Sequence, residues 1–132
     1  MSTEQQNVNA IIAALNTPSP ALGANAFTLS EIKKMTTRPA QYTEVVVCER
    51  VVTEGRFGGA SDGEAWRVIT RAVATVENNA REMRNRAKVR LFDQSITVDG
   101  RESTPIQRGS SSDPIAEDET YYSGTEEWIY AL

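Results

Sequence analysis

Two apolar segments separated by a glycine-rich stretch constrain the fold of this chain more than any other feature. Residues 41–54 and 66–73 are rich in valine and other strand-forming side chains. Nine of the residues between them, 55–63, include four glycines, which is typical of a long hairpin loop. We therefore expect two antiparallel strands around this loop. In the first strand, alternation predicts one face with Val45, Val47 and Val51 and another with Val46, Cys48, Arg50 and Val52. Because both faces are largely apolar, we expect this strand inside the sheet.

Apolar residues recur at helical spacing in two further places. The first run, from Val8 to Leu15, follows a polar capping sequence and ends before Pro18. The second run predicts a helix over residues 75–92, whose apolar stripe consists of Val76, Ala80, Met83, Ala87 and Leu91.

The remaining segments are shorter. Residues 27–29 favour an extended piece, and residues 30–35 fit either a helical turn or a strand. Asp99-Gly100 predicts a type I′ hairpin between residues 96–98 and 103–106, with Pro105 at an edge. Residues 109–114 are expected to form a loop, and residues 121–132 a terminal strand docked to the domain. The sequence thus predicts one α+β domain over residues 1–132: a mixed or antiparallel sheet with a long hairpin loop, on which an N-terminal helix and one long helix pack.

Composition excludes several kinds of active site. The chain has 132 residues, a net charge of −4, one cysteine and no histidine. Serine–histidine triads, cysteine–histidine pairs, histidine-containing zinc sites and an intramolecular disulfide are therefore impossible. Cys48 lies among valines and is expected to be a small buried hydrophobe. We predict no catalytic residue, metal or cofactor, and no apolar run is long enough to cross a membrane.

Charge is distributed unevenly along the chain. The long predicted helix carries Arg81, Arg84, Arg86, Lys88 and Arg90, and the C-terminal part carries Glu117, Asp118, Glu119, Glu126 and Glu127. The basic helix fits a solvated face, a phosphate contact or an acidic protein partner. The acidic residues fit a partner contact or simply solubility. We select the two sets as a candidate subunit interface: if the helix of one copy meets the acidic end of the next, such contacts between different patches can close into a ring.

The glycine-rich loop supplies the second candidate surface. It lacks the residues of a phosphate-binding loop. It fits either a plain loop or an arm that orders on a partner, with Arg56, Phe57, Gly58, Gly59, Ser61 and Asp62 as the candidate contact residues. Trp66 and Trp128 are expected in the core.

The order of these parts resembles the tail terminator, or tail completion, proteins of long-tailed phages, especially those of actinobacteria. The resemblance spans most of the chain and rests on segments such as Ile11–Leu15, Trp66–Val73 with Asn78–Arg81, Ile96–Arg101, Ser112–Ile115 and Trp128–Leu132. It implies a non-enzymatic virion protein, assembled in the host cytoplasm, that forms a hexameric ring on the finished tail tube. It also implies contacts with the tube protein and the head connector, and a channel through which DNA passes without specific binding.

Three alternatives remain open. A head-to-tail stopper has similar size and architecture and would bind filled heads instead of tail tubes. A small cytosolic ligand-binding domain or enzyme would need a pocket with convergent polar groups. A nucleic-acid binder would show a steep salt dependence at residues 81–90.

Overall fold

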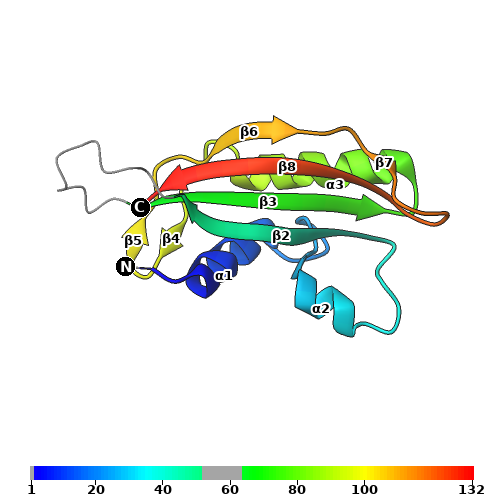
Figure 1. Cartoon of the computed structure of the whole chain (residues 1–132), viewed down its shortest axis with the longest axis horizontal. Helices are drawn as coiled ribbons and strands as arrows, with labels where there is room; N and C mark the ends of the chain where they lie inside the picture. Colours follow the sequence, from blue (N-terminus) through cyan, green and yellow to red (C-terminus); the bar gives the residue numbers. More distant parts are fainter. Residues whose placement is uncertain (1, 52–63) are drawn as a thin grey trace.

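The computed structural model of the protein describes residues 2–51 and 64–132, which form a six-stranded main sheet with two helices on one face and a separate two-stranded sheet (Figure 1). The helices are α1 (Glu4–Leu15), α2 (Leu29–Lys34) and α3 (Glu77–Leu91). The strands are β1 (Ala26–Thr28), β2 (Gln41–Val51), β3 (Ala65–Ala74), β4 (Thr97–Val98), β5 (Arg101–Glu102), β6 (Gln107–Ser111), β7 (Ile115–Ala116) and β8 (Tyr122–Ala131). The α+β class predicted from the sequence is confirmed.

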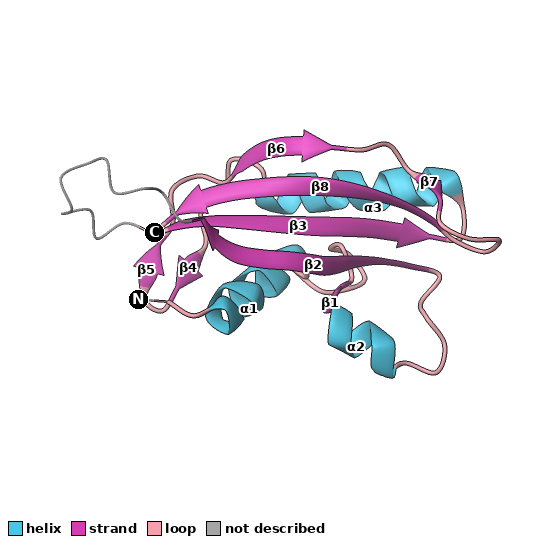
Figure 2. Cartoon of the chain, in the orientation of Figure 1, coloured by secondary structure: helices cyan, strands magenta, loops and turns pink. Residues whose placement is uncertain are grey.

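The main sheet has the order β1-β2-β3-β8-β6, with β7 paired to β8 (Figure 2). β1 runs parallel to β2, and every other pair in the sheet is antiparallel, so the sheet is mixed. The predicted pairing of residues 41–54 with 66–73 appears as β2 and β3, and β2 lies inside the sheet between β1 and β3. The predicted terminal strand is β8, inside the sheet between β3 and β6.

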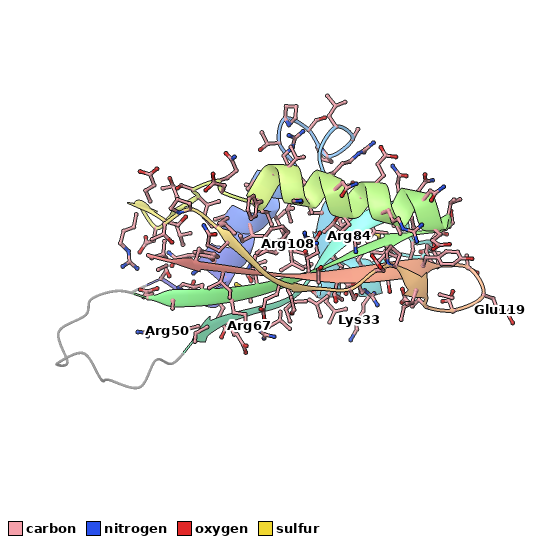
Figure 3. All side chains as sticks on the ribbon, turned by 90° about the horizontal axis from the view of Figure 1, so that it is seen from above. Lys33, Arg50, Arg67, Arg84, Arg108 and Glu119 are labelled. Atoms are coloured by element: carbon pink, nitrogen blue, oxygen red, sulfur yellow. The ribbon has the colours of Figure 1, made fainter. Side chains whose placement is uncertain are left out.

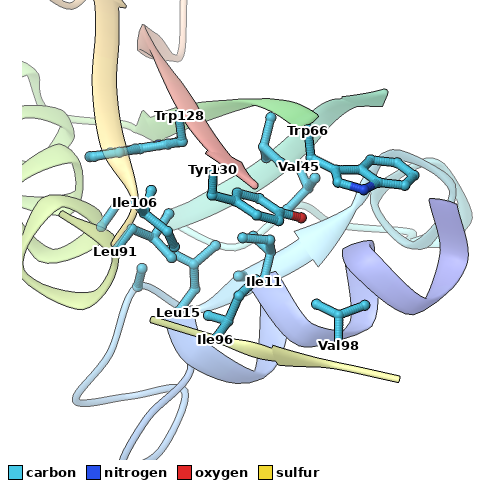
Figure 4. Close-up of a cluster of buried hydrophobic side chains, with 14 residues drawn as sticks. Ile11, Leu15, Val45, Trp66, Leu91, Ile96, Val98, Ile106, Trp128 and Tyr130 are labelled. Carbon is cyan, nitrogen blue, oxygen red and sulfur yellow. The ribbon is translucent and has the colours of Figure 1, made fainter. Parts of the chain in front are cut away.

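The main core lies between this sheet and the helices α1 and α3 (Figure 4). Alternation places Trp66 and Val68 of β3, and Trp128 and Tyr130 of β8, on the same face, and all four are fully buried. The helices contribute Ile11 and Leu15 from α1 and Ala87 and Leu91 from α3. Ala80 and Met83 of the predicted α3 stripe are also buried, whereas its first member, Val76, is half exposed. Both tryptophans are core residues, as expected.

A smaller cluster covers one end of the opposite face. Ile32 of α2 packs against Tyr42 and Val73, which alternate away from the main core. The sequence left residues 30–35 open between a helical turn and a strand, and the structure resolves them as helix. Thr28 and Glu31 form a reciprocal capping box at the start of α2, a signal that the sequence contains.

Three local predictions are wrong. A bulge between Val45 and Val47 resets the alternation of β2, so Val45 and Cys48 face the same side. Residues 103–106 are not a strand, because the two-residue turn at Asp99 (φ 50°) and Gly100 (φ 77°) pairs Val98 directly with Arg101. The predicted loop 109–114 begins inside β6, which runs to Ser111.

Gly23 holds the connection after α1 against the end of that helix. A Cβ at Gly23 would lie 2.3 Å from the Leu15 carbonyl oxygen, which also accepts a hydrogen bond from the Ala24 amide at 2.8 Å. We expect Gly23→Ala to lower the free energy of unfolding by roughly 1–3 kcal/mol, because backbone must move to admit the methyl group. Urea unfolding followed by circular dichroism measures this loss.

Gly109→Ala is the matched control. The three atoms nearest to its Cβ all belong to the side chain of Glu127, so a side chain and not backbone would have to move. A loss of stability at Gly109 as large as at Gly23 would contradict the steric explanation.

Candidate functional site

The basic side chains of α3 are largely engaged within the chain. Arg81 pairs with Glu77 at 2.6 Å and Arg86 with Glu82 at 2.7 Å, both one helical turn apart. Arg86 and Arg90 also donate to backbone carbonyls of residues 21–23, at 3.3–3.5 Å, and so hold that loop against the helix. Lys88 is exposed, and its ammonium lies 6.0 Å from the Phe92 ring centre.

Arg84 connects the basic helix to the acidic part of the same chain. Its guanidinium donates to the Ser112 carbonyl at 2.7 Å and to the Asp113 carboxylate at 3.2 Å. Figure 3 shows Arg84 and Arg108 on the helix-bearing side of the sheet. Part of the charge complementarity that the sequence suggested between subunits is therefore satisfied inside one copy.

Glu126 is the clearest correction to the candidate interface. It is 2% exposed on the core face of β8, so it does not belong to an exposed acidic surface. Its carboxylate lies 2.9 Å from Arg108, and neither of its oxygens has a hydrogen-bond partner among the described residues. Burial raises the pKa of Glu126, although Arg108, Arg84 and Lys88 act to lower it.

Glu117, Asp118 and Glu119 lie in the turn between β7 and β8. The Thr120 and Tyr121 amides donate to the Asp118 carboxylate at 2.7 and 2.8 Å, which lowers the pKa of that carboxyl. The guanidinium of Arg38, in the connection between α2 and β2, lies 4.1 Å from the centre of the Tyr121 ring and contacts the turn. Glu119 is exposed at the tip of the molecule (Figure 3).

The sheet face opposite α1 and α3 carries two rows of ion pairs. In one row, Arg67 of β3 bridges Glu49 of β2 and Glu127 of β8. In the other, Arg71 bridges Glu44 at 2.6 Å and Glu117 at 3.0 Å. Glu117 also lies 3.6 Å from Arg38. Glu117 and Glu127, both predicted as interface residues, are thus held by arginines of their own chain on a face whose charges are mutually compensated.

A groove of about 590 Å³ lies beside β2, between α1 and α2. Its apolar lining includes Val8, Leu29 and Val46, and Glu4, Glu49 and Lys33 supply its charges. Cys48 also lines it. Burial, followed by the fields of Glu4 and Glu49, raises the pKa of the Cys48 thiol to about 12. The raised pKa favours the thiol over the reactive thiolate. Cys48 is partly buried, not fully buried as the sequence predicted.

A buried polar network that sequence reasoning missed surrounds Glu64. Its carboxylate accepts hydrogen bonds from the Ser2 amide and hydroxyl at 2.9 and 2.6 Å, from the Trp66 indole at 3.0 Å and from Arg101 at 2.6 Å. Backbone bonds between Glu64 and Leu132 run in both directions. Although burial raises the pKa of Glu64, these donors lower it to about 2. No local sequence signal identifies partners so distant in the chain.

The described residues contain no group of three or more metal-binding side chains among histidine, cysteine, aspartate and glutamate. No helix in the described part of the chain is long and apolar enough to span a membrane. The loop candidates Arg56, Phe57, Gly58, Gly59, Ser61 and Asp62 lie outside the described residues.

Comparison with known proteins gives a fold but no family. No protein-family model and no curated protein matches the sequence. A solved structure whose name describes no activity is similar over 98% of this chain and 94% of its own length, with 14% identity and a TM-score of 0.55. At this identity the likeness shows a shared fold alone.

Proposed function

We propose that this chain is a structural, non-enzymatic protein of a phage virion. It forms a ring, a hexamer in the family it resembles, at the head-proximal end of the tail tube. There it ends tube polymerisation and joins the tail to the head connector, and DNA passes through its channel. This proposal rests first on the order of segments that resembles tail terminators, an order that fits the helix, hairpin, helix and terminal strand of the fold.

The observation that carries the proposal furthest is the compensated charge on the open sheet face. Glu44, Glu49, Glu117 and Glu127 offset Arg38, Arg67 and Arg71 there, and each arginine contacts at least one carboxylate. DNA-binding surfaces instead offer arginines and lysines to phosphates. A face of paired charges suits a channel wall that DNA passes without being held.

Binding to assembled phage parts tests the proposal directly. Purified protein is mixed with tail tubes that lack a terminator and, separately, with DNA-filled heads, and complexes are imaged by negative-stain microscopy. We expect rings at one end of the tubes and no binding to heads. Binding to heads alone would support the head-to-tail stopper, and binding to neither would overturn a neck function. Flanking genes for a tube protein and a connector would support the proposal independently.

The basic face of α3 is a proposed part of the subunit contact, and Lys88 is its best test. Lys88 is exposed and forms no ion pair among those found between described residues, whereas Arg84 pairs with Asp113 of its own chain. We expect Lys88→Glu to reduce assembly in light scattering at low salt, with the wild type converging on the variant as salt rises, because exposed charges are screened within about 8 Å at physiological ionic strength.

Lys34→Glu is the control for this experiment. It makes the same charge change on α2, away from α3, and Lys34 is also exposed. Equal loss of assembly in both variants would point to net charge rather than to a contact at α3. Unchanged assembly of Lys88→Glu would remove this helix from the interface.

A further inference from the structure

Strand β2 has a free edge where β1 ends. β1 pairs with β2 only at Thr43, Glu44 and Val45, whereas β2 continues to Val51. Along residues 46–49, no strand of the described chain pairs with β2 on the side away from β3. Edge strands with unpaired amides and carbonyls are templates for another strand. This stretch can therefore accept a strand that continues the line of β1.

The groove between α1 and α2 gives this edge room and apolar contacts. Thr28 at the end of β1, Leu29 at the start of α2 and Val8 of α1 are among its lining residues. Leu29 and Val46 are 41% and 40% exposed. A strand that enters the groove would cover both side chains while its backbone bonds to β2, so apolar burial and strand pairing would act together.

The opposite edge of the same sheet offers a matching strand. β6, from Gln107 to Ser111, pairs only with β8 among the described strands, and it contains no proline. Successive strands from β2 through β3 and β8 to β6 are antiparallel, so β2 and β6 point in opposite directions. Suppose that a second copy extends the sheet with its strands along the same axis and in the same order. Its β6 then lies antiparallel to β2 of the first copy, like the neighbouring strands from β2 to β6 within one copy.

The charge of Arg108 and the side of the sheet on which its side chain lies agree with this pairing. Arg108 is the charged residue of β6, and its side chain is 28% exposed on the helix-bearing side (Figure 3). In the groove, Glu4 belongs to α1 on that same side, whereas Glu49 of β2 pairs with Arg67 on the opposite face. Glu4 therefore places a carboxylate on the side from which Arg108 of the incoming strand would approach.

We propose that residues 46–49 of β2 bind strand β6 of a second copy of this chain in antiparallel pairing, so that the sheet continues from copy to copy. The contact joins two different surfaces, and it therefore repeats head to tail and closes into a ring when the rotation allows. This inference rests on the proposed function, for which it specifies a subunit contact distinct from the α3 surface.

Site-directed cross-linking tests the contact in the full-length protein. In a Cys48→Ser background, cysteines replace Val46 and Ser110 together, and a short bismaleimide reagent joins cysteines that come close. We expect most of the protein to shift from monomer to a ladder of covalent oligomers on a denaturing gel. The ladder should end at the ring size, because each copy contributes one of each cysteine.

The two single-cysteine variants are the controls. Each lacks one half of the proposed contact, so neither can form more than a dimer. A ladder no stronger than these controls would overturn the β2–β6 contact, and efficient dimers from Val46→Cys alone would show a symmetric β2–β2 contact instead. Circular dichroism spectra identical to wild type verify that the variants fold.

Microscopy of the same samples with tail tubes separates the two proposals. Rings on the tubes without a covalent ladder would overturn this contact and leave the terminator function standing. Neither rings nor ladder would overturn both. A ladder together with binding to filled heads alone would retain the contact and reject the terminator function.

Discussion

Replacing Trp128 with alanine is expected to lower the free energy of unfolding by roughly 3–5 kcal/mol, the cost of removing a large aromatic side chain from a packed core. Trp128 is fully buried in the centre of the sheet, and its indole donates to the Thr70 hydroxyl at 3.0 Å. The change leaves both a cavity and a buried hydroxyl without its donor. Single domains have a total stability of about 5–15 kcal/mol, so much of the margin would disappear.

Urea unfolding followed by far-ultraviolet circular dichroism measures this loss without relying on tryptophan fluorescence. Ile129→Ala is the matched control, because Ile129 is the next residue of β8 but is 41% exposed on the opposite face. We expect the control to cost less than about 1 kcal/mol. Similar losses in the two variants would mean that the core does not lie on the α1 and α3 side of the sheet.

Patterns within single elements were enough to predict most of the fold. The apolar stripe of α3 consists of residues that are three or four positions apart, and four of its five predicted members are buried. The bulge in β2 could not be predicted, since a run of valines carries no mark of where alternation is reset. The parallel pairing of β1 could not be predicted either, because a strand of three residues is too short to show an alternating pattern.

The roles of the candidate site residues were harder to predict, because they depend on contacts between segments that are distant in the sequence. Glu126 looked like part of an acidic surface, yet it shares the core face of β8 with Trp128 and Tyr130, two and four residues further along. That alternation can be read from the sequence, and it would have predicted a buried Glu126. The partner of Glu126 could not be predicted, because Arg108 belongs to β6, and the sequence does not show that β6 pairs with β8.

The Glu64 network explains how residues from both ends of the described chain are fixed beside the start of β3. Ser2 and Arg101 approach one carboxylate from opposite directions in the sequence, and Trp66 donates from within β3 itself. Asn7 extends the network, since it donates to the Ser2 hydroxyl and accepts from Tyr130. The buried Glu64 carboxylate is stable because these donors all point at it. Removing its charge should therefore lower the stability of the protein strongly.

Glu64→Gln is expected to destabilise the protein by about 2–4 kcal/mol at neutral pH, because an amide opposes the surrounding donors and leaves the Arg101 charge and the buried indole poorly paired. Urea unfolding at pH 7 measures the loss. Glu102→Gln, an exposed neighbour of Arg101 on β5, is the control and should change stability by less than about 0.5 kcal/mol.

The pH dependence of this difference gives a sharper test. The pKa of Glu64 in the folded protein is about 2, below its ordinary value of 4.5, so folding favours the ionised form. The stabilisation is complete above pH 4.5 and declines as the pH falls toward 2, because the unfolded chain then binds a proton that the folded chain resists. Glu64→Gln lacks this proton, and its stability should fall less steeply over that window. The gap between wild type and variant should therefore narrow as the solution is acidified. A gap that stays constant from pH 6 to about 2.5 would show that the Glu64 carboxylate gains nothing from its donors.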